Sequence, residues 1–447
     1  MTTTPIPAFP SGFRWGVSTS AYQIEGGADA DGRAPSIWDT FAGTPGRIVD
    51  GSSGATACDH YHRHTTDVAL LADLGVDAYR FSVAWPRVRP DGGCPVNPAG
   101  LDFYERLVDD LLTAGIDPVA TLFHWDLPQP LQDTGGWLNR DTAERFAEYA
   151  DAVAARLGDR VKLWITLNEP FIHLSLGHGT GEHAPGQALF LDALPVAHHQ
   201  LLAHGMAVAA LRARGAGPVA ITNHYSPVRP VGDTEADRAA AAGYHALHNR
   251  LFTDPLLGRG YPTGLTTPAV RDGDLDVIAA PIDVLGVNYY NPTGIRAAPE
   301  GSPLPFDLVE LDGYPRTACD WPVVPGGLRD VLVWLHAEYG DTLPPVQVTE
   351  SGCAYDDRPD AEGRVVDTDR IAYLDGHLRA VHEAITAGVD VQGYYVWSLL
   401  DNWEWAEGFT KRFGLVHVDY DTQTRTPKSS YTWFRDLIAA HRAAPRR

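Results

Sequence analysis

The 447-residue chain carries a formal net charge of −22, and this excess of acidic groups argues against nucleic acid or an anionic membrane as a partner. Because 44% of its residues are hydrophobic and it contains 12 Trp and 18 Tyr, the chain can bury a large core. Length alone predicts roughly three domains, although α/β barrels often run this long as a single domain.

The N-terminal segment Met1–Pro7 has neither a basic region nor an apolar core, so we expect no signal peptide. No apolar run approaches the ~18–20 residues that a membrane span needs. The four cysteines, Cys58, Cys94, Cys319 and Cys353, have no metal-type spacing. We interpret them as reduced thiols, which predicts a cytoplasmic protein.

Along the chain, short runs rich in β-branched and aromatic residues alternate with amphipathic stretches. The strand-like runs are Phe13–Thr19, Ala78–Trp85, Pro118–Trp125, Leu163–Asn168, Val219–His224, Val284–Tyr290, Val346–Glu350 and Gly393–Ser398. The helical patterns are Thr65–Leu74, Gly100–Ala114, Asp141–Leu157, Ala193–Arg212, Thr234–Leu251, Gly327–Tyr339 and Asp369–Ala387. Eight β–α units of this length favour an α/β fold of the (β/α)₈ TIM-barrel type.

An open doubly wound sheet is the competing architecture, and the first turn argues against it. Ser11–Gly16 lacks the G-x-G-x-x-G spacing of a dinucleotide fold, and no phosphate-binding loop motif occurs elsewhere. The Pro- and Gly-rich stretches Gly43–Gly54, Pro299–Pro305 and Ala354–Gly363 are then long loops at the C-terminal face of the strands. We therefore predict one catalytic domain over residues 1–447.

Two glutamates close strand-like runs that lie far apart in the sequence. Glu169 follows Leu163–Asn168 and precedes Pro170, and Glu350 ends Val346–Glu350. Catalytic residues of barrel enzymes lie at the C-terminal ends of the strands. Cleavage of a glycosidic bond needs two carboxyl groups, one as acid and one as nucleophile or base. The pair predicts a glycosidase.

Other strand ends carry amides, an imidazole and several indoles. Such a mixture suits carbohydrate, because polar groups pair with hydroxyls while aromatic faces cover the C–H face of a pyranose. Five motifs stand at these ends: Trp15-Gly16 with Ser20–Gly26, Tyr79–Ser82 with Trp85–Arg87, His124–Pro128, Thr166–Pro170 and Trp397–Trp405. On these motifs the chain resembles the β-glucosidases of glycoside hydrolase family 1 over nearly its whole length.

The resemblance implies a role for each matching position. Glu169 corresponds to the acid/base and Glu350 to the nucleophile, which Arg80 and Tyr290 would hold. The implied ligands of the sugar hydroxyls are Gln23, His124, Asn168, Glu404 and Trp405, and Asn288 belongs to the same Asn-x-Tyr pattern as Tyr290. The implied aromatic surfaces are Trp397 below the sugar, Trp125 and Phe413 beside it, and Trp321 toward the aglycone.

Two positions depart from the family pattern. Ser351 follows the nucleophile where the family usually has Asn, and we interpret it as a tolerated variant that can change the orientation of Glu350. Phe171 stands where Trp is common, which should alter aglycone preference more than catalysis. The run His60–His64 could suggest a metal site, but we interpret it as packing near a helix start. We predict no metal and no cofactor.

These features predict a retaining β-glucosidase that cleaves terminal β-glucosides, and also β-fucosides and β-galactosides, through a covalent glycosyl-enzyme. Its partners would be small β-glucosides and short oligosaccharides such as cellobiose. One alternative is a 6-phospho-β-glycosidase, which the negative charge of Glu404 near the sugar 6-hydroxyl disfavours. The other is a catalytically dead sugar-binding barrel, which the two intact glutamates disfavour.

Overall fold

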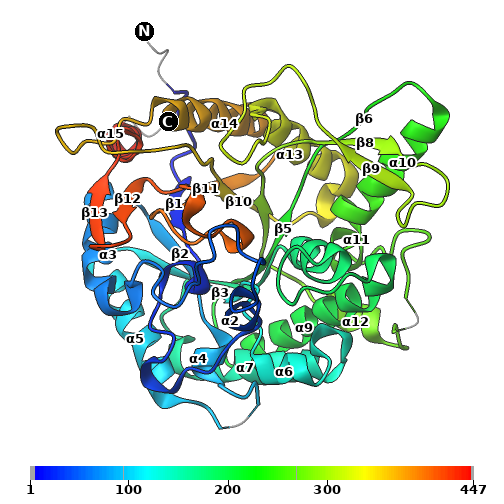
Figure 1. The fold of residues 1–447 in the computed structure, drawn as a ribbon, viewed down its shortest axis with the longest axis horizontal. Helices are drawn as coiled ribbons and strands as arrows, with labels where there is room; N and C mark the ends of the chain where they lie inside the picture. Colours follow the sequence, from blue (N-terminus) through cyan, green and yellow to red (C-terminus); the bar gives the residue numbers. More distant parts are fainter. Residues whose placement is uncertain (1–5, 94, 268, 444–447) are drawn as a thin grey trace.

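Eight parallel strands close into a barrel in the computed structural model, which describes residues 6–93, 95–267 and 269–443 (Figure 1). The order around the barrel is β1-β11-β10-β7-β5-β4-β3-β2. The strands are β1 (Arg14–Ser18), β2 (Ala78–Ser82), β3 (Asp117–Phe123), β4 (Leu163–Asn168), β5 (Val219–His224), β7 (Val284–Asn288), β10 (Val346–Ser351) and β11 (Val391–Trp397). The predicted TIM-barrel fold is confirmed.

Strands β4 and β5 have the predicted bounds, whereas others end earlier than predicted. The run Ala78–Trp85 leaves the sheet after Ser82, because Trp85 and Pro86 begin the short helix α4 (Trp85–Val88). The run Pro118–Trp125 likewise ends at Phe123, and Trp125 turns out of the strand with a φ of 75°. Because these two strands end early, the residues that follow them lie at the barrel mouth.

The inside of the barrel has an apolar layer below a polar one. Small and branched side chains, together with one tyrosine, fill the lower layer: Ala78, Val119, Leu163, Ile165, Ala220, Val284 and Tyr395. Because side chains in a strand alternate between its two faces, the next inward position lies two residues further along. There β2 carries Arg80 and β3 carries Thr121, both buried. The barrel core therefore gives way to polar side chains toward the C-terminal end of the strands.

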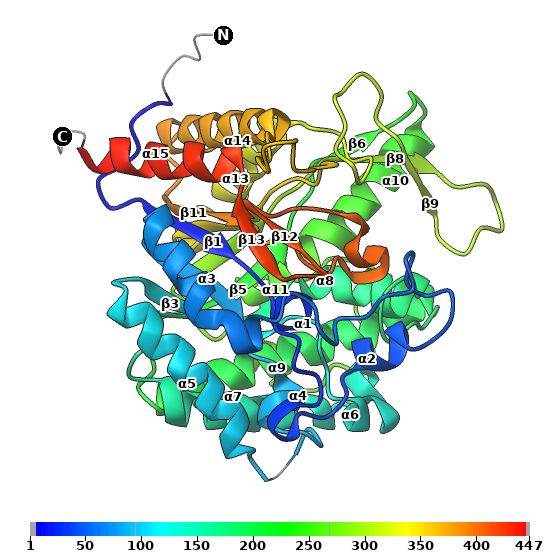
Figure 2. The same cartoon turned by 60° about the vertical axis from the view of Figure 1, so that its left-hand side comes forward.

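Helices surround the barrel (Figures 1 and 2). The long ones are α3 (His60–Leu74), α5 (Pro98–Thr113), α7 (Asp141–Leu157), α9 (Leu194–Ala213), α10 (Glu235–His245), α13 (Pro325–Tyr339), α14 (Thr368–Thr386) and α15 (Ser429–Ala443). Shorter ones are α1 (Ala21–Ile24), α2 (Ile37–Ala42), α6 (Gln129–Asp133), α8 (Pro170–Ile172), α11 (Thr253–Leu256) and α12 (Asp274–Ile278). Helix α15, which was not predicted, packs against α3 and α14 and completes the ring.

Two predicted helices differ from those observed. The segment predicted as Thr234–Leu251 is divided into α10, which Thr234 caps, and a π-helical stretch over Ala246–Arg250. Helix α10 packs on a small sheet at the barrel mouth. Helix α3 begins at His60 rather than at Thr65, so the histidine run lies in its first turns. There His60 Nδ1 is 2.7 Å from Asp67, which agrees with a packing role.

Two small sheets, neither of them predicted, rise from the barrel. Strands β6 (Val228–Pro230), β8 (Thr293–Ala297) and β9 (Phe306–Val309) form one, and β12 (Val416–Asp419) pairs with β13 (Thr424–Pro427) in the other. The three stretches predicted as loops contain no helix or strand. Pro299–Pro305 joins β8 to β9. Residues of β8 and β9 lie around the same hollow as the ends of the barrel strands, so the first sheet overhangs one side of the barrel mouth.

No helix among the described residues is long and apolar enough to cross a membrane. Cys58, Cys319 and Cys353 are free thiols, in agreement with the predicted reduced state, and Cys94 lies outside the described residues.

Candidate active site

Glu350 lies near the end of β10 with both carboxylate oxygens engaged. Arg80 Nη1 donates to Oε1 at 2.5 Å, and the Tyr290 hydroxyl donates to Oε2 at 2.8 Å. Arg80 is fully buried and anchored in turn by Thr121 Oγ1 at 3.0 Å. These contacts fix the orientation of the carboxylate, and the guanidinium stabilises its negative charge.

Glu169 begins the turn that follows β4 and has left-handed backbone angles, with a φ of 46°. Non-glycine residues adopt this region rarely, and functional sites are where such strain persists. The Glu169 N–H donates to the Thr222 carbonyl at 2.8 Å, and Asn288 Nδ2 donates to Glu169 Oε1 at 2.7 Å. Burial, and next the negative charge of Glu350, raise the pKa of Glu169 well above its usual range.

Asn168 connects the surroundings of the two glutamates. Its Oδ1 accepts from Arg80 Nη2 at 2.6 Å and from Asn288 Nδ2 at 3.1 Å. Its Nδ2 lies 3.0 Å from His124 Nε2. Burial, and next the positive charge of Arg80, lower the pKa of His124 well below its usual range, so the imidazole is neutral.

Glu404 and Gln23 form a second polar group across the pocket. Gln23 Nε2 donates to Glu404 Oε2 and to Asn402 Oδ1, both at 3.1 Å, and Ser20 Oγ donates to Gln23 Oε1 at 2.6 Å. Burial, and next the charge of Glu350, raise the pKa of Glu404 to about 8. The carboxyl therefore keeps oxygen atoms available for hydroxyl groups at neutral pH in either protonation state.

Aromatic rings cover the remaining walls. Trp397 and Phe413 belong to one buried cluster, against which Tyr290 and Trp321 pack. The rings of Trp321 and Phe413 lie 6.0 Å apart. On the opposite side Trp125 and Trp405 contact each other, with ring centroids 4.7 Å apart. The pocket thus offers flat apolar faces between its polar groups, as a pyranose requires.

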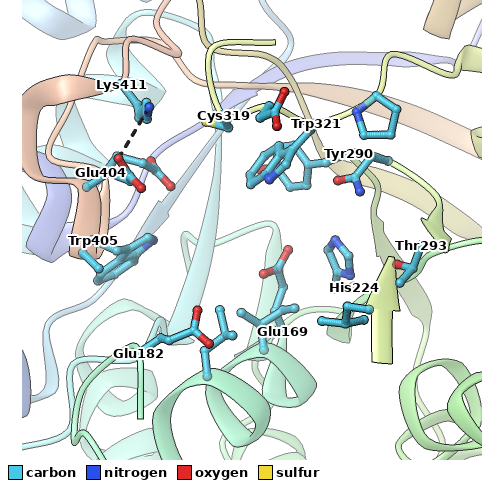
Figure 3. Close-up of a pocket in the computed structure, with 18 of the residues that line it drawn as sticks. Glu169, Glu182, His224, Tyr290, Thr293, Cys319, Trp321, Glu404, Trp405 and Lys411 are labelled. Carbon is cyan, nitrogen blue, oxygen red and sulfur yellow. Dashed lines mark ion pairs between the residues drawn. The ribbon is translucent and has the colours of Figure 1, made fainter. Parts of the chain in front are cut away.

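These side chains enclose a pocket of about 720 Å³, part of which is drawn in Figure 3. Predicted site residues that line it are His124, Trp125, Glu169, Tyr290, Trp321, Glu350, Trp397, Glu404, Trp405 and Phe413. Four others do not line it and lie buried behind it: Gln23, Arg80, Asn168 and Asn288. Gln23, Arg80 and Asn288 hold the lining carboxyls, and Asn168 in turn contacts Arg80 and Asn288.

Sequence reasoning missed several lining residues, among them Glu182, His224, Tyr244, His248, Thr293 and Leu308. Only His224 had a clear signal, because it ends the predicted strand Val219–His224. The others belong to the π-helical stretch after α10, the small overhanging sheet, helix α10 and the loop before α9.

The two departures from the family pattern differ in their surroundings. Ser351 is fully buried and does not line the pocket. Phe171 packs on His248, with ring centroids 4.2 Å apart. Among the residues that the structure describes, no group of three or more His, Cys, Asp or Glu side chains is arranged to hold a metal ion.

Known proteins show the same architecture and related sequences. The family model "Glycosyl hydrolase family 1" matches residues 6–443. Thermostable β-glucosidase B of Thermobispora bispora is 49% identical, covering 96% of this chain and 90% of its own. The bifunctional β-D-glucosidase/β-D-fucosidase of Bifidobacterium breve is 45% identical, with 97% and 99% covered.

A solved structure of the β-glucosidase of Thermotoga maritima in complex with glucoimidazole superposes with a TM-score of 0.93 at 42% identity. It covers 97% of this chain and 99% of its own. With a family match over residues 6–443 and relatives above 40% identity, the chain belongs to glycosyl hydrolase family 1.

Proposed function

We propose that this family 1 glycosyl hydrolase is a retaining β-glucosidase in which Glu350 is the nucleophile and Glu169 the acid/base. The observation that carries the proposal is the contrast between the two carboxyls. Glu350 contacts a guanidinium, which favours the charged form needed for attack. Glu169 is buried beside another carboxylate, which favours the protonated form needed in an acid.

In the first step, a Glu350 oxygen forms a bond to the anomeric carbon as the bond from that carbon to the leaving oxygen breaks. Glu169 gives its proton to the leaving oxygen. In the second step, the Glu169 carboxylate takes a proton from water, whose oxygen attacks the anomeric carbon and displaces Glu350. Two inversions give a product with the β configuration.

The glycone site in this proposal is the part of the pocket between Glu404 and Trp397. Glu404 would accept hydrogen bonds from the 4- and 6-hydroxyls, and His124 and Trp405 would contact the hydroxyls beside them. Trp125 and Phe413 would flank the ring, with Gln23, Asn168 and Asn288 supporting these contacts. A phosphate on the 6-hydroxyl would lie beside Glu404, where the negative charges of Glu350 and Glu407 also act, so 6-phosphoglucosides are disfavoured.

The proposed substrates are β-glucosides and short oligosaccharides such as cellobiose, with β-fucosides and β-galactosides also cleaved. The 45% identical relative named for glucosidase and fucosidase activity supports the broader range. The glucoimidazole complex of the Thermotoga maritima enzyme supports a glucose-like ligand in the pocket. Trp321 would support the aglycone.

Within the same proposal, residues 1–447 act as one catalytic unit in the cytoplasm. The large hydrophobic cluster that includes residues from Phe9 to Ile438 supports one unit. The buried free thiols of Cys58 and Cys353 suit a reducing compartment.

Hydrolysis of an aryl β-glucoside followed by NMR tests the proposal. The first sugar released should be the β-anomer, and Glu350→Gln should remove the activity. Release of the α-anomer first would contradict the assignment of Glu350 as nucleophile.

A further inference from the structure

His224 lines the pocket in a part that the proposed mechanism does not use. It ends β5, which lies across the barrel from β1. In Figure 3, Glu404 and Trp405 lie on one side of Glu169, and His224 and Thr293 lie on the other. Since Glu404 belongs to the proposed glycone site, His224 faces the space on the leaving-group side of Glu169.

A chain of hydrogen bonds runs from His224 away from the pocket centre. His224 Nδ1 lies 2.8 Å from His248 Nε2, and His248 Nδ1 lies 3.2 Å from the Tyr244 hydroxyl. The ring of His224 also stacks on that of Tyr290, with centroids 6.1 Å apart and planes 13° apart. The ring of Phe171 packs on that of His248. The imidazole of His224 is therefore held in one orientation, and its second nitrogen, Nε2, has no hydrogen-bond partner among the residues that the structure describes.

Burial lowers the pKa of His224 to about 4, and burial, and next His224, lower the pKa of His248 well below its usual range. Both rings are neutral near pH 7, so each has one N–H donor and one acceptor nitrogen. If Tyr244 donates to His248, then His248 donates to His224, and His224 Nε2 carries a proton. If Tyr244 accepts instead, every bond reverses and Nε2 becomes an acceptor.

Nε2 of His224 can donate or accept a hydrogen bond without any movement of the ring. It can therefore pair with a hydroxyl group, which also does both. A plain aryl leaving group offers no hydroxyl to pair with Nε2, whereas a sugar leaving group offers several. We propose that His224, oriented by His248 and Tyr244, is a specificity-determining residue that favours leaving groups bearing hydroxyls, such as a second sugar. This inference rests on the proposed β-glucosidase activity.

The test compares kcat/KM for cellobiose with kcat/KM for an unsubstituted phenyl β-glucoside, and the ratio of the two is the measured quantity. Loss of one hydrogen bond between neutral groups should lower this ratio about 3- to 10-fold in His224→Phe. His224→Gln, which restores a side chain that can donate and accept, should recover part of the ratio. Tyr244→Phe removes only the distal hydroxyl and should lower the ratio less than His224→Phe.

His336→Phe provides the matched control, because His336 is exposed on α13 and does not line the pocket. An unchanged ratio in His224→Phe would overturn this inference but not the proposed function. An equal loss of kcat/KM on both substrates, which His224→Gln does not restore, would do the same. Absence of phenyl glucosidase activity in the unsubstituted protein would overturn the proposed function and the inference with it.

Discussion

Arg80 and Glu350 form a buried ion pair, with Nη1 of Arg80 2.5 Å from Oε1 of Glu350. Glu169 has no such partner, because no Lys, Arg or His within the described ranges forms an ion pair with it. Its nearest donor is the neutral amide of Asn288. One carboxyl is thus stabilised as an anion while the other is buried as an acid, and this difference separates their proposed roles.

Alanine substitutions should distinguish the two roles. Glu350→Ala should abolish glycosylation for every substrate, because the attacking oxygen is gone, and added azide should restore turnover with an α-glycosyl azide as product. Glu169→Ala should spare substrates with good leaving groups, which need little protonation, and azide should then give the β-product. NMR of the glycosyl azides measures the configuration of each product. A β-azide from Glu350→Ala and an α-azide from Glu169→Ala would mean that the two roles are exchanged.

The pH dependence of kcat/KM should report the raised pKa of Glu169. As pH rises through that pKa the acid loses its proton, so activity on poor leaving groups should fall on the alkaline side. Because the charge of Glu350 contributes to the shift, Glu350→Gln should lower the pKa of Glu169. Titration of the Glu169 carboxyl by ¹³C NMR in both proteins measures this, and an unchanged pKa would contradict the coupling.

The presence of the barrel strands could be predicted from the sequence, because buried parallel strands are short continuous runs of apolar residues that turn residues terminate. Leu163–Asn168 and Val219–His224 agree with β4 and β5 for this reason. The C-terminal helix α15 also had a signal, since Tyr431, Phe434 and Ile438 recur at helical spacing and are buried.

The leaving-group side of the pocket could not be predicted in the same way. Thr293 and Leu308 come from the small sheet of β6, β8 and β9, whose short strands have no clear alternation. Tyr244 and His248 reach the pocket through a π-helical change at the end of α10, which depends on packing rather than on local propensity. The side chains at strand ends were predictable, and those supplied by inserted segments were not.

A buried group of charges below the loop that carries Glu404 should control stability. Lys428 Nζ lies 2.6 Å from Asp357 and 2.7 Å from Asp401, and Lys428 is 1% exposed. Lys428→Met would leave both carboxylates without this cation and should lower the free energy of unfolding by about 3–5 kcal/mol. Urea unfolding measures the loss.

The matched control is Arg358→Met, because the ion pair of Arg358 with Asp356 is largely exposed, at 79% and 74% of the two side chains. Its loss should change the free energy of unfolding by less than about 1 kcal/mol. Equal effects of Lys428→Met and Arg358→Met would contradict a special role for the buried group.

Glu404→Ala should weaken transition-state binding. The substitution leaves sugar hydroxyls unpaired in a desolvated pocket and removes one of the two acceptors of Gln23, at a cost of about 1–3 kcal/mol for each lost partner. Since these bonds should tighten as the sugar ring flattens, much of the loss should fall on kcat. Steady-state kinetics on aryl glucosides measures it, and an unchanged kcat/KM would contradict the assignment of Glu404.

Glu404→Gln should also stabilise the fold, by an amount that depends on pH. The native pKa of Glu404 is about 8, whereas an unfolded Glu titrates near its ordinary value of about 4.3. Between these values the native state holds a proton that the unfolded state has released, so stability falls as pH rises. The slope approaches about 1.4 kcal/mol per pH unit for a fully buried carboxyl and vanishes above the native pKa.

Gln does not titrate, so the variant's gain in unfolding free energy should be small at about pH 5 and larger by a few kcal/mol at about pH 8. Urea unfolding of both proteins at the two pH values measures the difference, and an equal gain at both would show that Glu404 is not protonated in the native pocket.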